Sequence, residues 1–157
     1  MLSDPPVRVR RPVSGDVERI GALVRSLSAD TIVSRFMGGI SRQTATDELC
    51  REILAGDRDF AFVAENAAGE LVGEAYAAIL TPDEAEIAFV VRDREQHHGV
   101  GTALLARIVA DLRARGITTV RADTMSQNTA MLALLREAGV PVIKHFVNGA
   151  VRATLAI

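Results

Sequence analysis

A single cysteine, Cys50, is the only thiol in this chain of 157 residues. A lone thiol cannot form an internal disulfide, and it excludes a zinc site with more than one thiolate ligand. The N-terminal stretch MLSDPPVRVRRP lacks the apolar segment of a signal peptide, and no apolar run approaches the ~20 residues that span a bilayer. We therefore expect a reduced, cytoplasmic protein with no membrane association.

Lysine is as scarce as cysteine. Lys144 is the one lysine among 18 basic residues, which stand against 20 acidic residues for a net charge of −2. The arginines form no basic block, so we expect no nucleic acid partner, because phosphate binding needs a clustered positive surface. Hydrophobic residues make up 48% of the chain, which excludes disorder as its main state. The length suits one domain over residues 1–157.

The hydrophobic pattern alternates between the period of a strand and that of a helix, which indicates a mixed α and β domain. Strand-like patterning predicts Val7–Arg11, Phe60–Glu65, Leu71–Ile79, Glu84–Val91, Thr118–Thr124, Val142–Phe146 and Val151–Leu155, the last two joined by an Asn-Gly hairpin turn. Helical spacing predicts helices within 17–27, 45–54, 100–112 and 128–138. Ser14 or Asp16 can cap the first helix, and residues 29–36 form a weaker helical segment ended by two glycines.

The most informative stretch is residues 96–102, Gln-His-His-Gly-Val-Gly-Thr, which lies between a predicted strand and a predicted helix. A helix N-terminus offers free backbone N–H groups and a positive dipole end, and both favour a phosphate. Gly99 and Gly101 allow a ligand close to the backbone. The third glycine of a dinucleotide-binding fingerprint and the Gly-Lys-Ser/Thr of a P-loop are both missing. The alternative is a turn that merely needs room against the sheet.

The pattern Gln-x-x-Gly-x-Gly at this junction resembles the acetyl-CoA loop of the GCN5-related N-acetyltransferases, the GNAT superfamily. Asn128, followed by Met131, Leu135 and Gly139, is similar to the family's second motif, in which an asparagine opens the helix after the fifth strand. The resemblance covers nearly the whole chain. It implies an α+β (α/β) GNAT fold with a mixed central sheet of about six to seven strands, splayed fourth and fifth strands, and four helices.

The resemblance also implies where the cosubstrate acetyl-CoA binds. Backbone groups of Phe89, Val90 and Val91 would pair with the pantetheine arm, and an N–H near Val90 or Val91 would polarise the thioester carbonyl. The other implied cofactor-binding residues are Gln96, His97, His98, Gly99, Val100, Gly101, Thr102 and Asn128. Asn128 is equally suited to capping the helix that follows it. No metal is expected, because the two adjacent histidines have poor geometry for a shared ion and no third ligand is evident.

Glu86 is the candidate catalytic residue. Attack on a thioester requires a neutral amine, so a base must take a proton from the ammonium. A carboxylate in an otherwise apolar strand is costly unless it is used or paired, which favours Glu86 as this general base. The alternative is a solvated residue or the partner of an arginine. Many family members carry a tyrosine as general acid where this chain has Leu135, and the only tyrosine, Tyr76, lies on the third expected strand of the sheet.

The segment from Ser28 to Phe36, SADTIVSRF, and the run AEIAFVV before the glycine loop resemble Pat-type bacterial protein lysine acetyltransferases. That resemblance implies that the strand glutamate at Glu86 serves as base and that the acceptor is a protein lysine. Arg35, within this segment, is expected to be solvated and near enough to meet a substrate.

Two other functions remain open at this point. A small amine such as an aminoglycoside, polyamine or amino acid is an alternative acceptor, since 12 of the 20 acidic residues precede residue 81. A non-catalytic module that binds acetyl-CoA is the other. A monomer and a homodimer both fit, because exposed strand edges such as Val151–Leu155 can pair.

Overall fold

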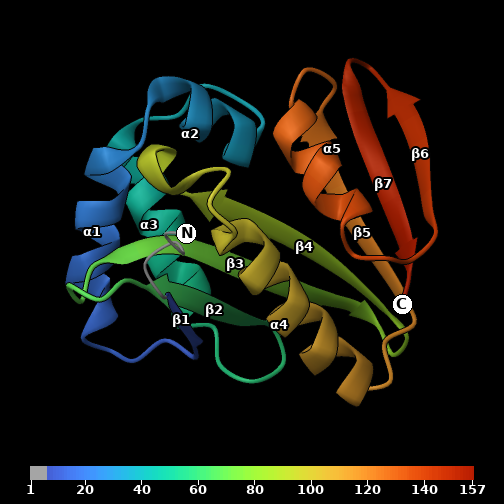
Figure 1. Cartoon of the computed structure of the whole chain (residues 1–157), viewed down its shortest axis with the longest axis horizontal. Helices are drawn as coiled ribbons and strands as arrows, with labels where there is room; N and C mark the ends of the chain where they lie inside the picture. Colours follow the sequence, from blue (N-terminus) through green and yellow to red (C-terminus); the bar gives the residue numbers. More distant parts are fainter. Residues whose placement is uncertain (1–6) are drawn as a thin grey trace, which may run out of the picture.

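One sheet organises the molecule. In this computed structural model, which describes residues 7–157, seven strands lie in the order β1-β2-β3-β4-β5-β7-β6 (Figure 1). Neighbouring strands are antiparallel except β4 and β5, which run parallel. The strands are β1 (Arg8–Arg10), β2 (Phe60–Glu65), β3 (Leu71–Thr81), β4 (Glu84–Val91), β5 (Thr119–Met125), β6 (Val142–Val147) and β7 (Ala150–Ala156).

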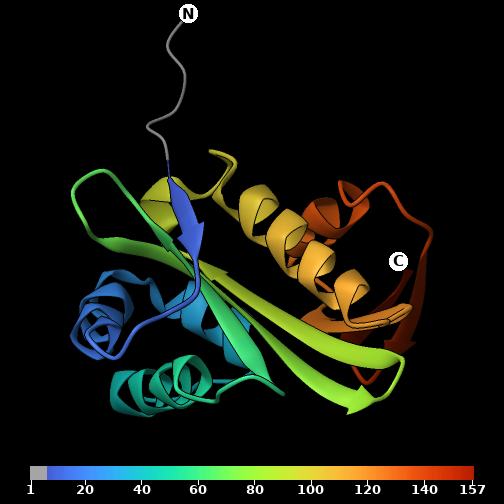
Figure 2. The ribbon, with the colours of Figure 1, turned by 90° about the horizontal axis from the view of Figure 1, so that it is seen from below.

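Five helices cover the two faces of this sheet (Figure 2). They are α1 (Asp16–Ser26), α2 (Ala29–Phe36), α3 (Arg42–Ile53), α4 (Val100–Ala114) and α5 (Thr129–Arg136), with a 3-10 turn at Asp93–Glu95. The helices α1 and α3 lie on one face, while α4 and α5 lie on the other. The helix α2 contacts β4 and β5.

The amphipathic pattern of α4 fixes which face the helix presents to the sheet. Leu104, Ile108 and Leu112 recur at helical spacing and are fully buried in the core cluster that includes Phe62 of β2. Successive strand residues point to opposite faces, so Val63 packs in the second cluster, against α1 and α3. The central strands are therefore apolar on both faces because each face carries its own helical layer.

The sheet separates between β4 and β5, as the resemblance to the GNAT superfamily implied. The ladder between them holds three residue pairs and ends where Glu86 meets Arg121. Beyond this point β4 continues beside β3 to Val91, and β5 continues beside β7 to Met125. The facing edges of the two strands thus carry backbone N–H and C=O groups with no strand partner, and this gap positions the site.

The prediction of four helices was wrong, because residues 29–36 form a regular helix, α2. The side chain of Ser28 caps it by accepting a hydrogen bond from the backbone N–H of Thr31 at 3.1 Å. The helix ends at Met37, which has a positive φ of 57°, and so it stops before the two glycines. Its stability depends on this cap and on tertiary contacts, which helical periodicity does not reveal.

Two details near the N-terminus also differ from expectation. The residue preceding α1 is Gly15, which offers no side chain, so neither Ser14 nor Asp16 caps the helix. Asp16 is the first helical residue and instead pairs with Arg10 at 2.8 Å. The first strand is shorter than predicted and spans only Arg8–Arg10.

Candidate active site

A cleft of about 440 Å³ occupies the gap between β4 and β5. The helix α2 forms one wall and α5 forms the opposite wall, and the two helices flank the gap in Figure 1. The lining residues are Ser28, Asp30, Thr31, Ser34, Arg35, Ala88, Phe89, Val90, Val91, Asp93, Gln96, His97, Gly99, Gly101, Thr102, Asp123, Thr124, Asn128, Ala130, Met131, Ala133, Leu134 and Glu137. Most of the residues that the sequence singled out therefore come together here.

The N-terminus of α4 opens into this cleft without a side-chain cap. Gly99 precedes the helix with a φ of 86°, and no side chain there accepts from the first turn. A Cβ added at Gly101 would meet the side chain of Leu134 at 3.2 Å, so the glycine allows α5 to pack closely against the start of α4. Uncapped N–H groups at the positive end of a helix suit the phosphates of a nucleotide, and this fits the pyrophosphate of coenzyme A.

The exposed edge of β4 forms the floor of the cleft. Phe89, Val90 and Val91 all line it, beyond the point where pairing with β5 has stopped. Unpaired main-chain groups along an extended edge can hydrogen-bond the amides of a pantetheine arm as they would a further strand. The residues present therefore fit acetyl-CoA at both its phosphate and its pantetheine ends.

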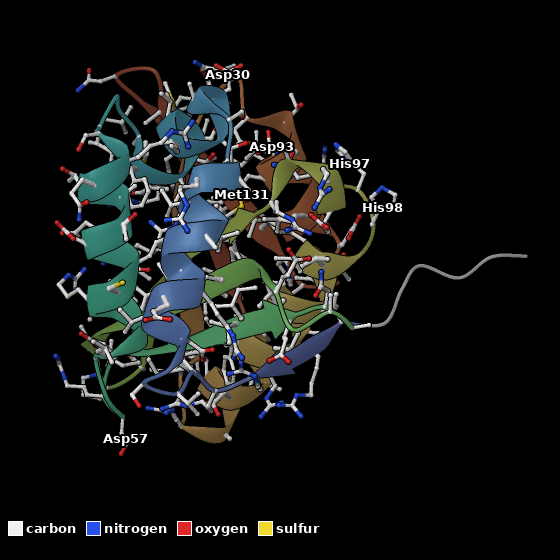
Figure 3. The ribbon with its side chains drawn as sticks, turned by 90° about the vertical axis from the view of Figure 1, so that its left-hand side faces the viewer. Asp30, Asp57, Asp93, His97, His98 and Met131 are labelled. Carbon is white, nitrogen blue, oxygen red and sulfur yellow. The ribbon has the colours of Figure 1, made fainter. Side chains whose placement is uncertain are left out.

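The side chains of the glycine loop, residues 96–102, differ in where they lie. The Gln96 side chain donates to the carbonyl oxygen of Val91 at 3.0 Å and to Thr31 Oγ1 at 3.3 Å, so it ties the loop to β4 and α2. His97 lines the cleft with a positive φ of 65°, whereas His98 does not line it; both lie on the outer turn in Figure 3. The side chain of Val100 is buried in the core.

Asn128 caps α5. Its Oδ1 accepts a hydrogen bond from the backbone N–H of Met131 at 3.1 Å, while the residue also lines the cleft. The cap fixes where α5 begins. It thereby places Met131 in the cleft wall opposite α2 (Figure 3).

Glu86 lies at the point where the two strands separate. It is the last β4 residue paired with β5, and by strand alternation its side chain shares a face with Ala88 and Val90, which line the cleft. Glu86 itself is half-buried and lies outside the lining. Its β5 neighbour Arg121 is ion-paired with Glu84, the next residue on the same face of β4.

Arg35 is not solvated, contrary to expectation. Its guanidinium donates to both carboxylate oxygens of Glu52 on α3, at 2.5 and 2.8 Å, and lies 3.8 Å from Glu74 on β3. All three side chains are more than 90% buried. Burial and the neighbouring Glu52 carboxylate raise the pKa of Glu74 well above its usual range. One guanidinium cannot neutralise two buried carboxylates, so burial and the charge of Glu52 favour the protonated form of Glu74.

Carboxylates dominate the charged groups of the cleft. The Asp93 carboxylate accepts hydrogen bonds from the backbone N–H of Ser28 and from the hydroxyl of Thr31, each at 3.0 Å. Burial raises the pKa of Asp93, but these hydrogen bonds have the larger effect together and lower it. Arg152 donates to Asp123 at 2.8 and 2.9 Å and lowers its pKa. Asp30 lies near Asp93 on the same end of the molecule in Figure 3. Such a lining favours a positively charged acceptor.

Residues 28–140 match the Acetyltransferase (GNAT) family. The chain belongs to this family. The matched stretch contains α2, β4, β5, the glycine loop and α5, so it includes every wall of the cleft. The GNAT assignment accounts for the strand separation and for the open helix end together, because both are needed to hold an extended thioester.

Two of the most similar proteins are Pat acetyltransferases. Acetyltransferase Pat of Mycolicibacterium smegmatis is 28% identical over 154 residues, which are 89% of this chain and 45% of that protein. The chain thus spans less than half the length of this relative. The GNAT domain of Pat from S. lividans has a TM-score of 0.83 at 27% identity, covering 96% of this chain and 90% of that chain.

The fold extends to more distant GNAT enzymes. The spermidine N-acetyltransferase of Vibrio cholerae, solved with CoA and spermine, has a TM-score of 0.72 at 18% identity, covering 96% of this chain and 95% of that chain. Within residues 7–157 of the present chain, no cluster of three His, Cys, Asp or Glu side chains suited to a metal ion is found. Over the same residues, no helix combines the length and apolarity needed to cross a membrane.

Sequence reasoning missed three residues of this site. Glu52 and Glu74, which lie behind the cleft, were not singled out from the sequence, and their contact with Arg35 joins three separate segments. Thr124 on β5 is 1% exposed and lines the cleft, yet its hydroxyl has no hydrogen-bond partner among residues 7–157. The only available signal was strand alternation, which gives Thr124 the same face as the buried residues Val120 and Ala122.

Proposed function

We propose that this GNAT domain transfers the acetyl group of acetyl-CoA to the ε-amine of a protein lysine, with Glu86 as the general base. The observation that carries the proposal is the separation of β4 from β5 directly after Glu86, with the uncapped end of α4 beside the gap. This arrangement combines main-chain groups for an extended thioester with a carboxylate at the inner end of the gap.

The residues divide the work by position. Backbone N–H groups of the glycine loop would hold the pyrophosphate, the Phe89–Val91 edge would hold the pantetheine, and an N–H near Val90 would polarise the thioester carbonyl. Glu86 would accept a proton from the incoming ammonium, directly or through water, so that a neutral amine is available. The acetyl thioester supplies the activated acyl carbon.

The acceptor class is inferred from the α2 wall. The segment from Ser28 to Phe36, which resembles that of Pat enzymes, forms α2 and supplies Asp30, Ser34 and Arg35 to the cleft. The likeness to two Pat proteins at 27% and 28% identity supports a lysine acceptor. The carboxylate-rich lining also favours a small polyamine, which is the second candidate because it too is a primary amine with positive charge.

Thiol release from acetyl-CoA tests both candidates with a panel of acceptors. Lysine peptides, folded acyl-CoA synthetases, polyamines and aminoglycosides are compared with the wild type and Glu86→Gln, all carrying Cys50→Ser so that the dye reads only product thiol. We expect turnover with lysine-bearing proteins or peptides. Loss of a general base should lower kcat by about 100-fold or more at neutral pH.

Glu84→Gln is the matched control, because it removes a carboxylate from the same face of the same strand and should keep turnover near wild type. The residual rate of Glu86→Gln should rise as the pH approaches the pKa of the acceptor amine, because more of the amine is then neutral without a base. Turnover with polyamines alone would select the second candidate. Full turnover by Glu86→Gln would overturn the base assignment, and binding of acetyl-CoA without turnover of any acceptor would indicate a non-catalytic module.

A further inference from the structure

The hydroxyl of Thr124 is a buried polar group without a hydrogen-bond partner in the described structure. The residue lies on β5, is 1% exposed and lines the cleft. A threonine hydroxyl can donate one hydrogen bond and accept two, and burying it without a partner is unfavourable compared with an apolar residue of the same shape. A valine would fit this strand at least as well, so packing alone does not explain the hydroxyl.

Three other hydroxyls that line the cleft are already engaged. Ser28 donates to Thr31 Oγ1 at 3.0 Å, and Thr31 donates to Asp93 at 3.0 Å. Thr102 donates to Glu137 at 2.7 Å. Their protons are therefore committed within the protein, whereas the Thr124 proton is available to a ligand.

The position of Thr124 matches the place where the thioester of an extended donor is proposed to bind. It lies three residues beyond Arg121, the last β5 residue paired with β4, so continuing that register would place it opposite Phe89. Three residues of strand span about 10 Å, which places Thr124 across the gap from the Phe89–Val91 edge, where the thioester carbonyl is proposed to bind. A donor molecule anchored by its phosphates at α4 would bring its thioester towards this position.

We propose that the Thr124 hydroxyl donates a hydrogen bond to the sulfur of acetyl-CoA and stabilises the departing thiolate. In the transfer, the nitrogen of the neutral amine forms a bond to the acyl carbon, the C–S bond breaks, and its electron pair goes to sulfur, while the proton that the nitrogen then loses passes through water to the thiolate or to solvent. A hydrogen bond to sulfur strengthens as negative charge develops there, so it acts mainly on the transition state. This inference rests on the proposed function, because it presupposes that acetyl-CoA occupies the cleft.

The test compares Thr124→Val with the wild type in two measurements. Titration calorimetry gives the dissociation constants of coenzyme A and of desulfo-coenzyme A, which lacks the sulfur. We expect the wild type to bind coenzyme A more tightly than the desulfo analogue above the thiol pKa, and Thr124→Val to lose that preference. In steady-state assays we expect kcat to fall about ten- to a hundredfold, as for a lost hydrogen bond to a charged group, with the KM for acetyl-CoA nearly unchanged.

Thr124→Ser keeps the hydroxyl and should stay within a few-fold of wild type, and Ser34→Ala removes a cleft hydroxyl from α2 and should leave the sulfur preference intact. Thr124→Ala repeats the binding test should the valine variant fold poorly. An unchanged sulfur preference in the valine and alanine variants would overturn the inference, as would a loss confined to KM. Failure of the wild type to bind coenzyme A at all would instead refute the proposed function.

Discussion

The guanidinium of Arg35 on α2 and the carboxylate of Glu52 on α3 form an ion pair from which water is nearly absent. Their side chains are 8% and 5% exposed, and two hydrogen bonds of 2.5 and 2.8 Å join them. Arg35 also lines the cleft. The contact therefore links the helix that forms one wall of the cleft to the helical layer behind it.

Replacing Arg35 should be strongly destabilising. Arg35→Met leaves the Glu52 and Glu74 carboxylates buried without their cation, and breaking a buried pair in this way costs about 3–5 kcal/mol. Urea denaturation measures the free energy of unfolding. The control Glu48→Gln breaks the exposed pair with Arg51 on the same helix and should cost less than about 1 kcal/mol. Equal decreases in the free energy of unfolding for the two variants would show that the buried pair contributes no more to stability than the exposed pair.

The stability of the protein should carry a pH signature from Glu74. Its pKa in the folded state lies above the usual 4.5, so the folded state holds the proton more tightly than the unfolded chain does. That stabilisation is complete below pH 4.5 and is lost as the pH rises through the folded pKa. The melting temperature of Glu74→Gln should therefore rise relative to that of the wild type as the pH increases above 4.5.

Glu95→Gln should change the pH dependence of stability in the opposite direction. Hydrogen bonds from Arg92 lower the pKa of Glu95. The wild type should therefore be more stable than this variant at neutral pH, and the difference should disappear as the pH falls below the ordinary pKa of a glutamate. If the melting temperatures of Glu74→Gln and wild type stayed parallel from pH 5 to 9, the buried proton would be ruled out.

Alanine substitutions at Gly99 and Gly116 distinguish the effect of backbone strain from an effect on ligand binding. They flank α4 with φ of 86° and 85°, and a Cβ at either position meets no atom within 4 Å. Alanine at each should cost a similar 1–2 kcal/mol, roughly the penalty of a left-handed conformation. Only Gly99→Ala should weaken acetyl-CoA binding, by roughly tenfold if one phosphate hydrogen bond is lost. Calorimetric titration measures this, and equal affinities would place the phosphates elsewhere.

Glu137 places a negative charge beside the proposed phosphate site. Its carboxylate accepts the hydrogen bond of Thr102, a residue in the first turn of α4. Glu137→Gln should tighten coenzyme A binding several-fold at low ionic strength and less at high salt, because the repulsion is screened. Glu48→Gln, on α3, serves as the charge control. Weaker binding by Glu137→Gln would mean that this contact holds α5 in its ligand-binding position.

Local sequence patterns predicted the fold more fully than the site. The spacing of Leu104, Ile108 and Leu112 predicted α4, and the Asn148-Gly149 turn, with φ of 49° and 79°, joins β6 to β7 as expected. Each of these two sequence signals is local, because all of its residues are close together in the sequence. The helix α2 was underestimated because Ser28 and Arg35 stabilise it through a cap and a distant partner.

The chemistry of the cleft depended on which segments meet. The glycine loop was recognisable because a phosphate site needs only a strand, a turn and a helix in succession. The buried cluster of Arg35 with Glu52 and Glu74 joins α2, α3 and β3, and no spacing rule brings those together. The unpaired hydroxyl of Thr124 is likewise a tertiary property, since it depends on the absence of neighbours. The role of Glu86 stays a prediction that its placement at the strand separation makes testable.

The short ladder between β4 and β5 also bears on how this protein can change over evolutionary time. A donor held by amide groups of the backbone places few demands on side-chain identity, so most substitutions along the floor of the cleft preserve donor use. The α2 wall, in contrast, contributes side chains to the cleft and, on the proposed function, would present them to the acceptor. New acceptors can therefore be acquired by altering one short helix, while the machinery for the acetyl donor is inherited unchanged.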